Sequence, residues 1–471
     1  MFEGQGFRAR AHHLVGVAAA KMPQAAAPSA KVDTAGLLPR ASRRSLAGVD
    51  AQPAIASPVR KPPSARLRLG PELQQRQPEQ QRQGLVPPRP RRPQMECVMP
   101  SEITVAQLFE AYYDCRRSKR TTRAALAFEV NLEENLLTLL RELQAGTWQP
   151  SPATVFAITR PKPREVWAAD FRDRIVHHLV YRAIAPLFEP SFIADSCACI
   201  PGRGTLYGAN RLRRHLLSAT ESWTKPTFVL KADIANFFGS IRHADLFAML
   251  ARRVKDPTVL DLCRKLVFQD VRQGAILRGA AHHMALVPRH KSLFHAPPGT
   301  GLPIGNLSSQ FFANVYLDGL DQMIKRRLRM RHYVRYVDDM VLVHPDPNVL
   351  LRAADAIREH LAEIGLALAE SKTFVAPADR GVDFVGQVIR PHRTIGRAKT
   401  HRAAMHRLSA MPKEDLAESV NSYLGLFLHT GSRAQCTAIA RLAHQRGLKI
   451  SRDLNKVAVN HKSSRRKKQR R

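Results

Sequence analysis

The sequence lacks several features that would have assigned it to a familiar class. None of its apolar runs reaches the ~18 residues that a membrane-spanning helix needs, so we expect no membrane association. Its six cysteines form no CxxC pair and no Cys/His set with zinc spacing, which favours a reducing, cytoplasmic location. Cys197 and Cys199 form only a CxC, and in a strand they would share one face as small buried residues.

Acidic residues are also scarce: 39 Asp plus Glu stand against 74 Lys plus Arg, a formal charge of +35. This excess goes beyond what solubility requires and predicts attraction to a polyanion, above all nucleic acid. Such binding weakens steeply as salt rises. The 44% hydrophobic content argues against a wholly disordered chain. The length of 471 residues predicts roughly two to four domains of ~150 residues.

Aromatic residues are nearly absent from the first 95 residues, which contain 13 prolines, 10 glutamines, and 16 basic against 5 acidic residues. Such a segment cannot bury enough apolar surface to offset its ordering entropy, so residues 1–98 are predicted to be a disordered Pro/Gln/Arg-rich extension. It is either a basic RNA-tethering arm or dispensable, and Met95 or Met99 is an alternative start. Residues 456–471 are predicted to be a basic tail, either solvated or an accessory phosphate-binding patch.

From residue 102 onward, hydrophobic periodicity predicts helices and strands without strict βα order, which is typical of an α+β fold. Ser101 or Thr104 is expected to cap the first helix. The first predicted helix ends at about residue 115. The other predicted helices cover 124–145, 175–188, 307–327, 349–364, 399–411 and 414–447. The predicted strands cover 155–158, 228–234, 333–336, 340–344 and 382–389.

Three acidic residues stand at the ends of apolar strand segments. Asp338 and Asp339 lie between two such segments, and Asp233 ends another. Adjacent aspartates ordinarily form a solvated turn. Here the apolar segments on both sides predict that the turn extends from a buried sheet. Joining a 3′-hydroxyl to a nucleoside triphosphate uses two divalent ions ~3.5–4 Å apart. Because magnesium prefers hard oxygen ligands, these carboxylates are candidates for holding it.

Six segments, in order between about residues 155 and 390, together resemble the reverse transcriptases, which are RNA-directed DNA polymerases. Residues 231–241 (KADIANFFGSI) resemble the first catalytic motif of that family, and residues 336–339 (YVDD) resemble its YxDD box. Residues 301–310 (GLPIGNLSSQ) occupy the place of the third shared motif. The other similar segments are the basic fingers at 160–164 and 171–177, the lysine motif at 365–373 and the primer-grip hairpin at 382–386.

The resemblance implies a right-hand polymerase, with fingers and a palm of antiparallel sheet plus helices at 99–390 and a short helical thumb at 391–455. It implies two Mg²⁺ ions, or Mn²⁺, and as partners an RNA template, a DNA or RNA primer and dNTPs. The residues implied at the metal site are Asp233, Ile234, Asp338 and Asp339.

The resemblance also implies residues that contact the nucleotide and the primer. Lys162 and Arg164 would meet the triphosphate, or else form an exposed basic loop. Phe238 would exclude a ribose 2′-hydroxyl, or else pack in the core. Lys372 would donate a proton to pyrophosphate, or else be an ordinary surface lysine. The remaining residues are Ile304, Gly305 and Gln310 near the nucleotide and Phe384, Val385 and Gly386 at the primer grip.

One departure from the family pattern narrows the choice of enzyme. Most members carry QGxxxSP in the third motif, whereas residues 304–310 read IGNLSSQ. This form resembles the enzymes of diversity-generating retroelements, as does KSLF at 291–294. These enzymes copy a template RNA with errors at adenines and work with a small basic accessory protein. A glutamine at this position could hydrogen-bond near the base pair, whereas Ile304 can only pack. Discrimination against misshapen base pairs would then be weaker. Alternatively, Ile304 merely fills space.

Two other interpretations stay open. A phage-defence or unclassified group II-like reverse transcriptase would share the same core. A basic RNA-binding module with a dead polymerase site is a different class of protein, but the three aspartates that it would have lost are present.

Overall fold

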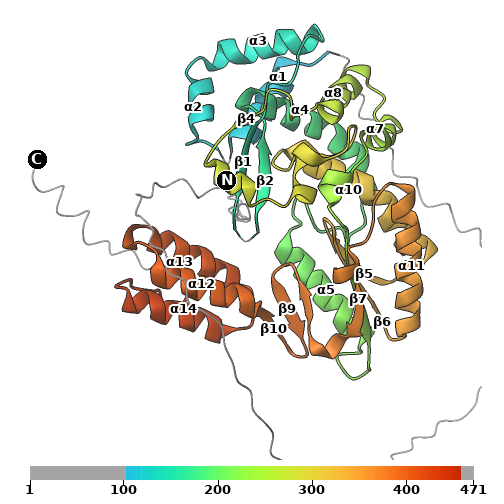
Figure 1. The fold of residues 1–471 in the computed structure, drawn as a ribbon, viewed down its shortest axis with the longest axis vertical. Coiled ribbons are helices and arrows are strands. Elements are labelled where there is room, and N and C mark those ends of the chain that lie inside the picture. The colour runs from blue at the N-terminus through green and yellow to red at the C-terminus, as the bar shows by residue number, and fades with distance from the viewer. Residues whose placement is uncertain (1–101, 118, 161, 458–471) are drawn as a thin grey trace, which may run out of the picture. The chain divides into compact units, whose positions relative to one another are not determined.

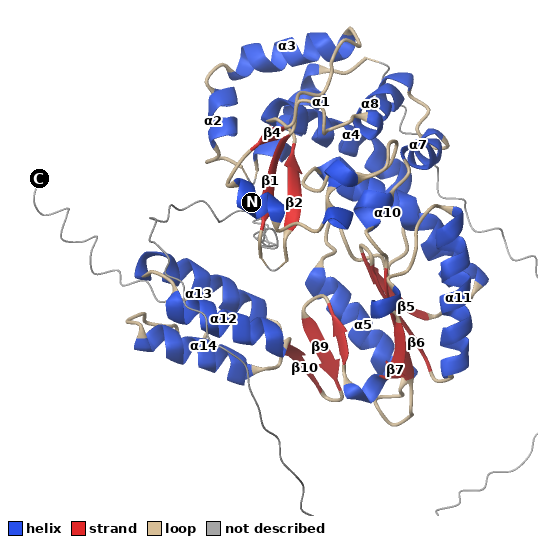
Figure 2. Ribbon diagram, viewed as in Figure 1, coloured by secondary structure: helices blue, strands red, loops and turns tan. Residues whose placement is uncertain are grey.

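The computed structural model describes residues 102–117, 119–160 and 162–457. The predicted extension at 1–98 lies outside the described residues, as does all but the start of the predicted basic tail. The described chain mixes helices with antiparallel and mixed sheets (Figure 1, Figure 2), which confirms the α+β class. No helix in the described ranges is long and apolar enough to cross a membrane.

Three helices open the described chain: α1 (Val105–Arg116), α2 (Arg123–Glu129) and α3 (Leu132–Gln144). Thr104 caps α1 through a capping box, because its hydroxyl accepts from the Gln107 N–H while the Gln107 side chain accepts from the Thr104 N–H. The single helix predicted over 124–145 is wrong. The chain leaves helical geometry at Asn131, which becomes the N-cap of α3.

A small sheet and a long buried helix follow. Strand β1 (Thr154–Ile158) pairs antiparallel with β2 (Arg164–Ala168) and parallel with β4 (Ile276–Leu277). Helix α4 (Phe171–Phe188) begins four residues before the predicted 175, because the Asp170 carboxylate caps it by accepting from the Arg172 N–H at 3.0 Å.

The central sheet is antiparallel, with the strand order β5-β6-β3-β7. Its strands are β3 (Phe228–Asp233), β5 (His332–Tyr336), β6 (Asp339–His344) and β7 (Phe374–Pro377). Side chains alternate between its two faces, as a period of two requires. Val229 and Val341 pack in one cluster with Leu212 of α5 (Thr205–Ala219), whereas Leu230 packs in another with α11 (Pro347–Glu363). Figure 1 shows α5 and α11 beside this sheet.

Helix α10 (Leu307–Gln322) leads into the central sheet. It continues as a π-helix, η4 (Met323–Arg327), and residues 328–331 connect this helix to β5. The helices between β3 and α10 are α6 (Phe237–Ser240), α7 (His243–Ala251), α8 (Pro257–Phe268) and α9 (Ala281–Ala285). Short 3₁₀ turns lie at η1 (Glu189–Ser191), η2 (Arg289–Lys291), η3 (Leu293–His295), η5 (Glu370–Lys372) and η6 (Ala378–Arg380).

A second antiparallel sheet contains β8 (Val382–Phe384), β9 (Gln387–Arg390) and β10 (Arg393–Gly396). The single strand predicted over 382–389 is therefore a hairpin. Val385 and Gly386 form its two-residue turn, with φ values of 44° and 90°. Positive φ at both positions is what a type I′ turn needs.

Three helices with their own apolar core end the described chain: α12 (Ala398–Ala410), α13 (Lys413–Leu428) and α14 (Arg433–Gln445). The helix predicted over 414–447 is broken between α13 and α14. At this break the Gly431 N–H donates to the Thr394 carbonyl of β10 at 2.7 Å. The backbone of Gly431 is therefore bonded to a strand of another element and not within a helix.

Candidate active site

Strands β3 and β6 bring the predicted metal-site residues to one end of the central sheet. Asp233 and Asp339 are direct partners in the antiparallel register. One residue further, the Ile234 N–H donates to the Asp338 carbonyl at 3.2 Å. The strand alternation places the side chains of Asp233 and Asp339 on the same face of the sheet. Residues separated by about a hundred positions in the sequence therefore meet at one end of the central sheet.

The turn that carries Asp338 is conformationally strained. Val337 has a φ of 57°, a left-handed conformation that is a genuine outlier for a β-branched residue. The guanidinium of Arg335 donates to the Val337 carbonyl at 3.0 Å. Only 1% of the Arg335 side chain is exposed. A buried side chain on β5 thus supports the turn from beneath.

Arg335 is itself fixed by a buried network. Its guanidinium donates to both carboxylate oxygens of Asp321 on α10, at 2.9 and 2.6 Å, and to the hydroxyl of Ser196 at 3.0 Å. Asp321 also accepts from the Tyr333 hydroxyl at 2.7 Å. Two-point pairing of this kind fixes direction as well as distance. Helix α10 and the segment before α5 therefore determine where the turn stands.

The carboxylates repel one another in a largely buried position. Burial, and then the charge of Asp233, raises the pKa of Asp338. Burial is also the main reason that the pKa of Asp339 rises to about 6, although the ammonium of Lys231 at 3.6 Å opposes it. The Oδ1 atom of Asp339 is buried without a hydrogen-bond partner among the described residues. A hard cation would relieve this repulsion and satisfy that oxygen, so the residues fit a divalent metal ion.

The described residues contain no ready-made cluster of three or more His, Cys, Asp and Glu side chains suited to a metal ion. Asp233 instead forms an ion pair with Lys372. This arrangement suits magnesium, which usually binds through one or two carboxylates and takes its other ligands from phosphates and water. Lys372 also lies where a phosphate group next to Asp233 would meet it.

Further cations surround the carboxylates. Lys162 and Arg164 lie at the β1–β2 hairpin and are exposed. Partial desolvation, followed by the nearby ammonium groups of Lys372 and Lys291, lowers the pKa of Lys162. The guanidinium of Arg164 opposes the effect of burial on the pKa of Asp338. Together with Lys231 and Lys372, these two residues bring four cations near the aspartates and form a site suited to a polyphosphate.

The third shared motif connects β2 with the helix that follows Asp233. The Trp167 N–H donates to the Ile304 carbonyl at 2.8 Å, and the Leu302 N–H donates to the Phe238 carbonyl at 2.8 Å. Gly305 has a φ of 136°, and a Cβ there would lie 2.7 Å from the Trp167 carbonyl oxygen. Glycine is therefore required at 305 by close approach of the backbone. The Phe238 side chain is half-buried, and its ring lies 5.3 Å from that of Phe237.

The polar residues that follow Gly305 have structural partners. The Asn306 side chain accepts from the Ala169 N–H at 3.2 Å, and the Ser308 hydroxyl bonds to His177 at 2.6 Å. Gln310 is exposed, and its side-chain oxygen accepts from the Cys199 thiol at 3.6 Å. Cys199 stands in a turn with a φ of 56°, so the strand considered for the CxC pair is absent.

The predicted primer-grip residues differ in accessibility. Phe384 is 0% exposed and packs in the cluster that contains Leu212, so its side chain stays in the core. Val385 and Gly386 form the tip of the hairpin. The Lys231 ammonium connects this hairpin to the aspartates, because it donates to the Asp383 carbonyl at 2.5 Å and lies close to Asp339.

Sequence reasoning assigned no role to Arg335, Asp321 or Lys231, which all bear on the aspartates. The sequence did carry a signal for Arg335 and Lys231. Each is a charged residue inside an apolar strand, and a buried charge needs a partner. Their partners could not be read from the sequence, because Asp321 is on a different element and Asp383 contributes a backbone carbonyl.

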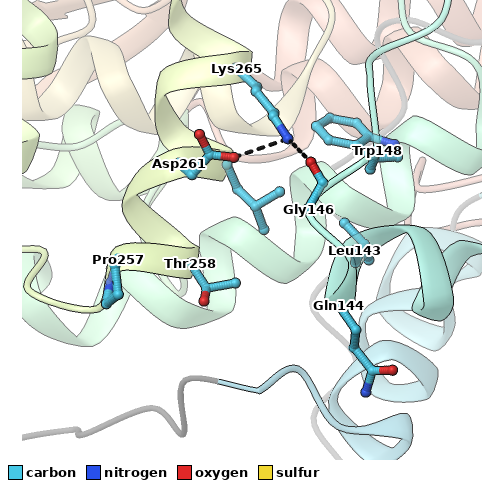
Figure 3. Close-up of a pocket in the computed structure, with 9 residues that line it drawn as sticks. Leu143, Gln144, Gly146, Trp148, Pro257, Thr258, Asp261 and Lys265 are labelled. Carbon is cyan, nitrogen blue, oxygen red and sulfur yellow. Dashed lines mark hydrogen bonds and ion pairs between the residues drawn. The ribbon is translucent and has the colours of Figure 1, made fainter.

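A separate hollow of about 260 Å³ lies between α3 and α8 (Figure 3). The Lys265 ammonium inside it bonds to Asp261 at 3.0 Å and to the Gly146 carbonyl at 2.7 Å. None of the predicted site residues lines this hollow, and its lysine is already neutralised. It therefore has no part in the site formed by the aspartates.

Comparison with known proteins identifies the class. Residues 160–389 match the family described as reverse transcriptase (RNA-dependent DNA polymerase). This part of the chain is a reverse transcriptase domain with the right-hand polymerase fold, and its enzyme class is RNA-directed DNA polymerase.

The chain is similar to several particular proteins. Protein YkfC of Escherichia coli (strain K12) is 25% identical over 335 residues, covering 63% of this chain and 79% of that protein. The group II intron-encoded protein LtrA of Lactococcus lactis subsp. cremoris is 23% identical over 195 residues, covering 41% of this chain but only 28% of LtrA. A solved telomerase from Candida albicans, in complex with a telomeric RNA fragment, aligns with a TM-score of 0.39 and 14% identity. That alignment covers 62% of this chain and 57% of the telomerase chain.

Proposed function

We propose that this chain is the error-prone reverse transcriptase of a diversity-generating retroelement, copying an RNA template into cDNA by extending a primer with dNTPs. The observation that carries this proposal is the IGNLSSQ segment at 304–310, in which an apolar Ile304 stands beside strand β2. A small basic accessory protein that delivers the template is part of the proposal.

Asp233 and Asp338 would hold two Mg²⁺ ions, with Asp339 and the backbone at Ile234 completing the site. When bound, the ions activate the attacking 3′-hydroxyl and neutralise the triphosphate. Support comes from the mutual repulsion of the aspartates and from the unpartnered Oδ1 atom of Asp339.

The residues around the aspartates would bind and orient the nucleotide. Lys162 and Arg164 would contact the triphosphate oxygens as charge-assisted donors. Lys372 would leave its ion pair with Asp233 and contact the leaving pyrophosphate, to which it would donate a proton. Phe238 would close the space that a ribose 2′-hydroxyl needs, and its half-buried position leaves part of the ring available to the sugar.

Ile304 supports the error-prone part of the proposal. Its backbone is fixed by the bond to Trp167, while its side chain, which is partly exposed, has no polar atom. A glutamine here could bond to the nucleotide or template and penalise a misshapen base pair. Isoleucine contributes packing alone, so discrimination between base pairs would weaken.

A group II-like reverse transcriptase with no diversity-generating role is the second candidate. The similarity to the group II intron-encoded LtrA favours it. Both candidates use the same aspartates, so only their error patterns differ.

Sequencing cDNA made from one defined RNA template tests the proposal. The wild-type enzyme should misincorporate more often opposite adenine than opposite the other three bases. Uniform errors across the four bases would overturn the diversity-generating assignment and leave the group II-like candidate.

A further inference from the structure

The connection between α10 and β5 is a polybasic turn, defined here as residues 325–331. It reads Lys-Arg-Arg-Leu-Arg-Met-Arg, so that five of its seven residues are basic. The four arginines Arg326, Arg327, Arg329 and Arg331 are exposed. Within the described part of the chain, none of these four forms an ion pair with an acidic residue.

The backbone of the polybasic turn is ordered by specific bonds. The Leu328 N–H donates to the Met323 carbonyl, and the Met330 N–H donates to the Ile324 carbonyl, each at 3.0 Å. Met330 is buried. Arg329 has a φ of 53°, a conformation uncommon outside glycine. Such strain, together with the π-helix at η4, is typical of functional segments, and the ordered backbone fixes the positions from which the arginines extend.

Lys325 points inward and neutralises the nearest acid. Its ammonium bonds to Asp195 and to the Arg331 carbonyl, each at 2.8 Å. Asp195 also accepts from Arg211 at 2.7 Å and from His215 at 2.8 Å. This single buried carboxylate already has three cationic or potentially cationic partners. It offers no negative charge to the arginines.

The surroundings of the turn are electropositive. Burial, followed by the nearby His215, Arg331 and Lys325, lowers the pKa of His332 to about 4. His332 and His215 lie 3.3 Å apart at their Nδ1 atoms. A second histidine and two cations thus add to the effect of burial in opposing protonation of His332, while Asp195 acts in the opposite direction.

The polybasic turn lies at the end of β5 opposite to the aspartates. Strand β5 runs from His332 to Tyr336, and the YVDD turn follows it. Five residues at about 3.3 Å each place the two turns ~17 Å apart along the strand. The arginines are therefore too distant to serve the triphosphate.

We propose that the polybasic turn binds the phosphate backbone of RNA outside the template–primer duplex. This inference rests on the proposed function in one respect, that RNA is the natural ligand of the chain. Guanidinium groups match phosphate oxygens through paired donors, and such contacts add affinity without reading sequence. No large hydrophobic side chain within the turn is exposed, so it lacks the apolar anchor on which a protein interface usually depends.

The test compares two triple variants of the full-length chain. The first is Arg326→Gln/Arg327→Gln/Arg331→Gln, which leaves the left-handed Arg329 in place. The control, Arg120→Gln/Arg123→Gln/Arg141→Gln, removes the same charge from exposed arginines near α2 and α3. Affinity for a long, structured RNA is measured over a series of KCl concentrations.

The first variant should lose about tenfold in affinity, and the slope of log K against log salt should fall by roughly 2, at ~0.7–0.9 for each lost phosphate contact. The control should bind within about twofold of wild type. Unchanged binding by the first variant would overturn the proposal. An equal loss in the control would also overturn it, because net charge alone would then explain the effect.

Extension of a primer on a short homopolymer RNA separates this proposal from the proposed function. The first variant should extend such a substrate as wild type does, since the polybasic turn lies away from the aspartates. A wild-type chain that binds long RNA but fails to extend would contradict the proposed function alone. A first variant that melts normally but loses extension would place the arginines in the active site and overturn the inference. If the triple variant melts early, the single variants Arg326→Gln and Arg327→Gln replace it, each expected to account for about a third of the slope change.

Discussion

The guanidinium of Arg335 donates a hydrogen bond to the Val337 carbonyl at 3.0 Å, two residues along the same chain. Val337 occupies the strained position of the turn that presents Asp338. Because Arg335 is paired with Asp321 on α10, the position of a candidate metal ligand depends on a buried ion pair beneath it. Strain of this kind persists only when the surroundings enforce it.

Removing Arg335 should therefore affect both stability and catalysis. Arg335→Gln leaves Asp321 charged and unpaired in the interior, which should cost about 3–5 kcal/mol of the free energy of unfolding. The double variant Arg335→Gln/Asp321→Asn removes that lone charge and should recover much of the loss. Its kcat for primer extension should nevertheless stay about 10–100-fold below wild type, because the turn loses its support.

Melting curves and primer extension, measured on the same preparations, separate the two effects. Asp321→Asn alone is the matched control, since it retains the Arg335 side chain that donates to Val337. It should also lose stability, because it leaves the Arg335 charge without its ion-pair partner in the interior. A double variant that extends at the wild-type rate would show that this bond is dispensable.

Phe238 is expected to select the sugar. Phe238→Ala should raise ribonucleotide incorporation relative to deoxynucleotide, because a smaller side chain admits the 2′-hydroxyl. The measurement is incorporation of rNTP against dNTP on one template, with a melting curve beside it. Phe237→Ala is the control, since the neighbouring ring is buried in the core and should affect stability alone. Unchanged discrimination in a folded Phe238→Ala protein would show that this ring only packs.

Ile304→Gln restores the residue that most reverse transcriptases carry. It should reduce misincorporation opposite template adenine while keeping extension within roughly tenfold, equivalent to ~1.4 kcal/mol in the barrier. Sequencing cDNA from a defined template measures both. An adenine bias that survives the substitution unchanged would move its cause to another part of the site.

Acid should destabilise the protein through His177. Burial, and then the nearby His178 and Arg174, lowers the pKa of His177 to about 3. The unfolded chain binds this proton at about pH 6.5, whereas the folded chain resists it, so stability falls as pH falls from ~6.5 toward 3. At pH 5 the loss from this residue should be about 2 kcal/mol.

Urea unfolding at about pH 7.5 and pH 5 measures this loss. His177→Gln should have a smaller difference between the two pH values than wild type. The exposed His406→Gln serves as the control and should keep the wild-type difference. An equal pH dependence in all three proteins would contradict the account of His177.

Much of the fold could be predicted from sequence periodicity. Two of the errors fall at breaks between helices, and a third is the hairpin within the strand predicted over 382–389. Asn131 and Gly431 are turn-forming residues, but regular apolar spacing on both sides of each concealed the interruption. The break at Gly431 also depends on a bond to Thr394, which belongs to another sheet. Local patterns carry no information about such a partner.

The aspartates of the candidate site could be located because each lies at the end of an apolar strand or directly beside it. The residues that support the aspartates from beneath could not be located in the same way. Arg335 reads as one charge in a strand, and only folding brings Asp321 beside it. The role of Phe384 in a primer grip stays a prediction from its motif, and the structure adds that the alternation of β8 directs its ring into the core.

Primer extension by Asp338→Asn, beside wild type, tests the central claim most directly. The assay uses a homopolymer RNA template, dNTPs and Mg²⁺, with RNA binding and melting measured in parallel. Because Asp338 is repelled by Asp233, replacing it with a neutral isostere should leave the fold intact. We predict that DNA synthesis falls at least about a hundredfold, a loss of ~2.7 kcal/mol or more in transition-state stabilisation, while RNA binding is unchanged. Synthesis above about a hundredth of the wild-type rate would contradict the assignment of Asp338 as a metal ligand.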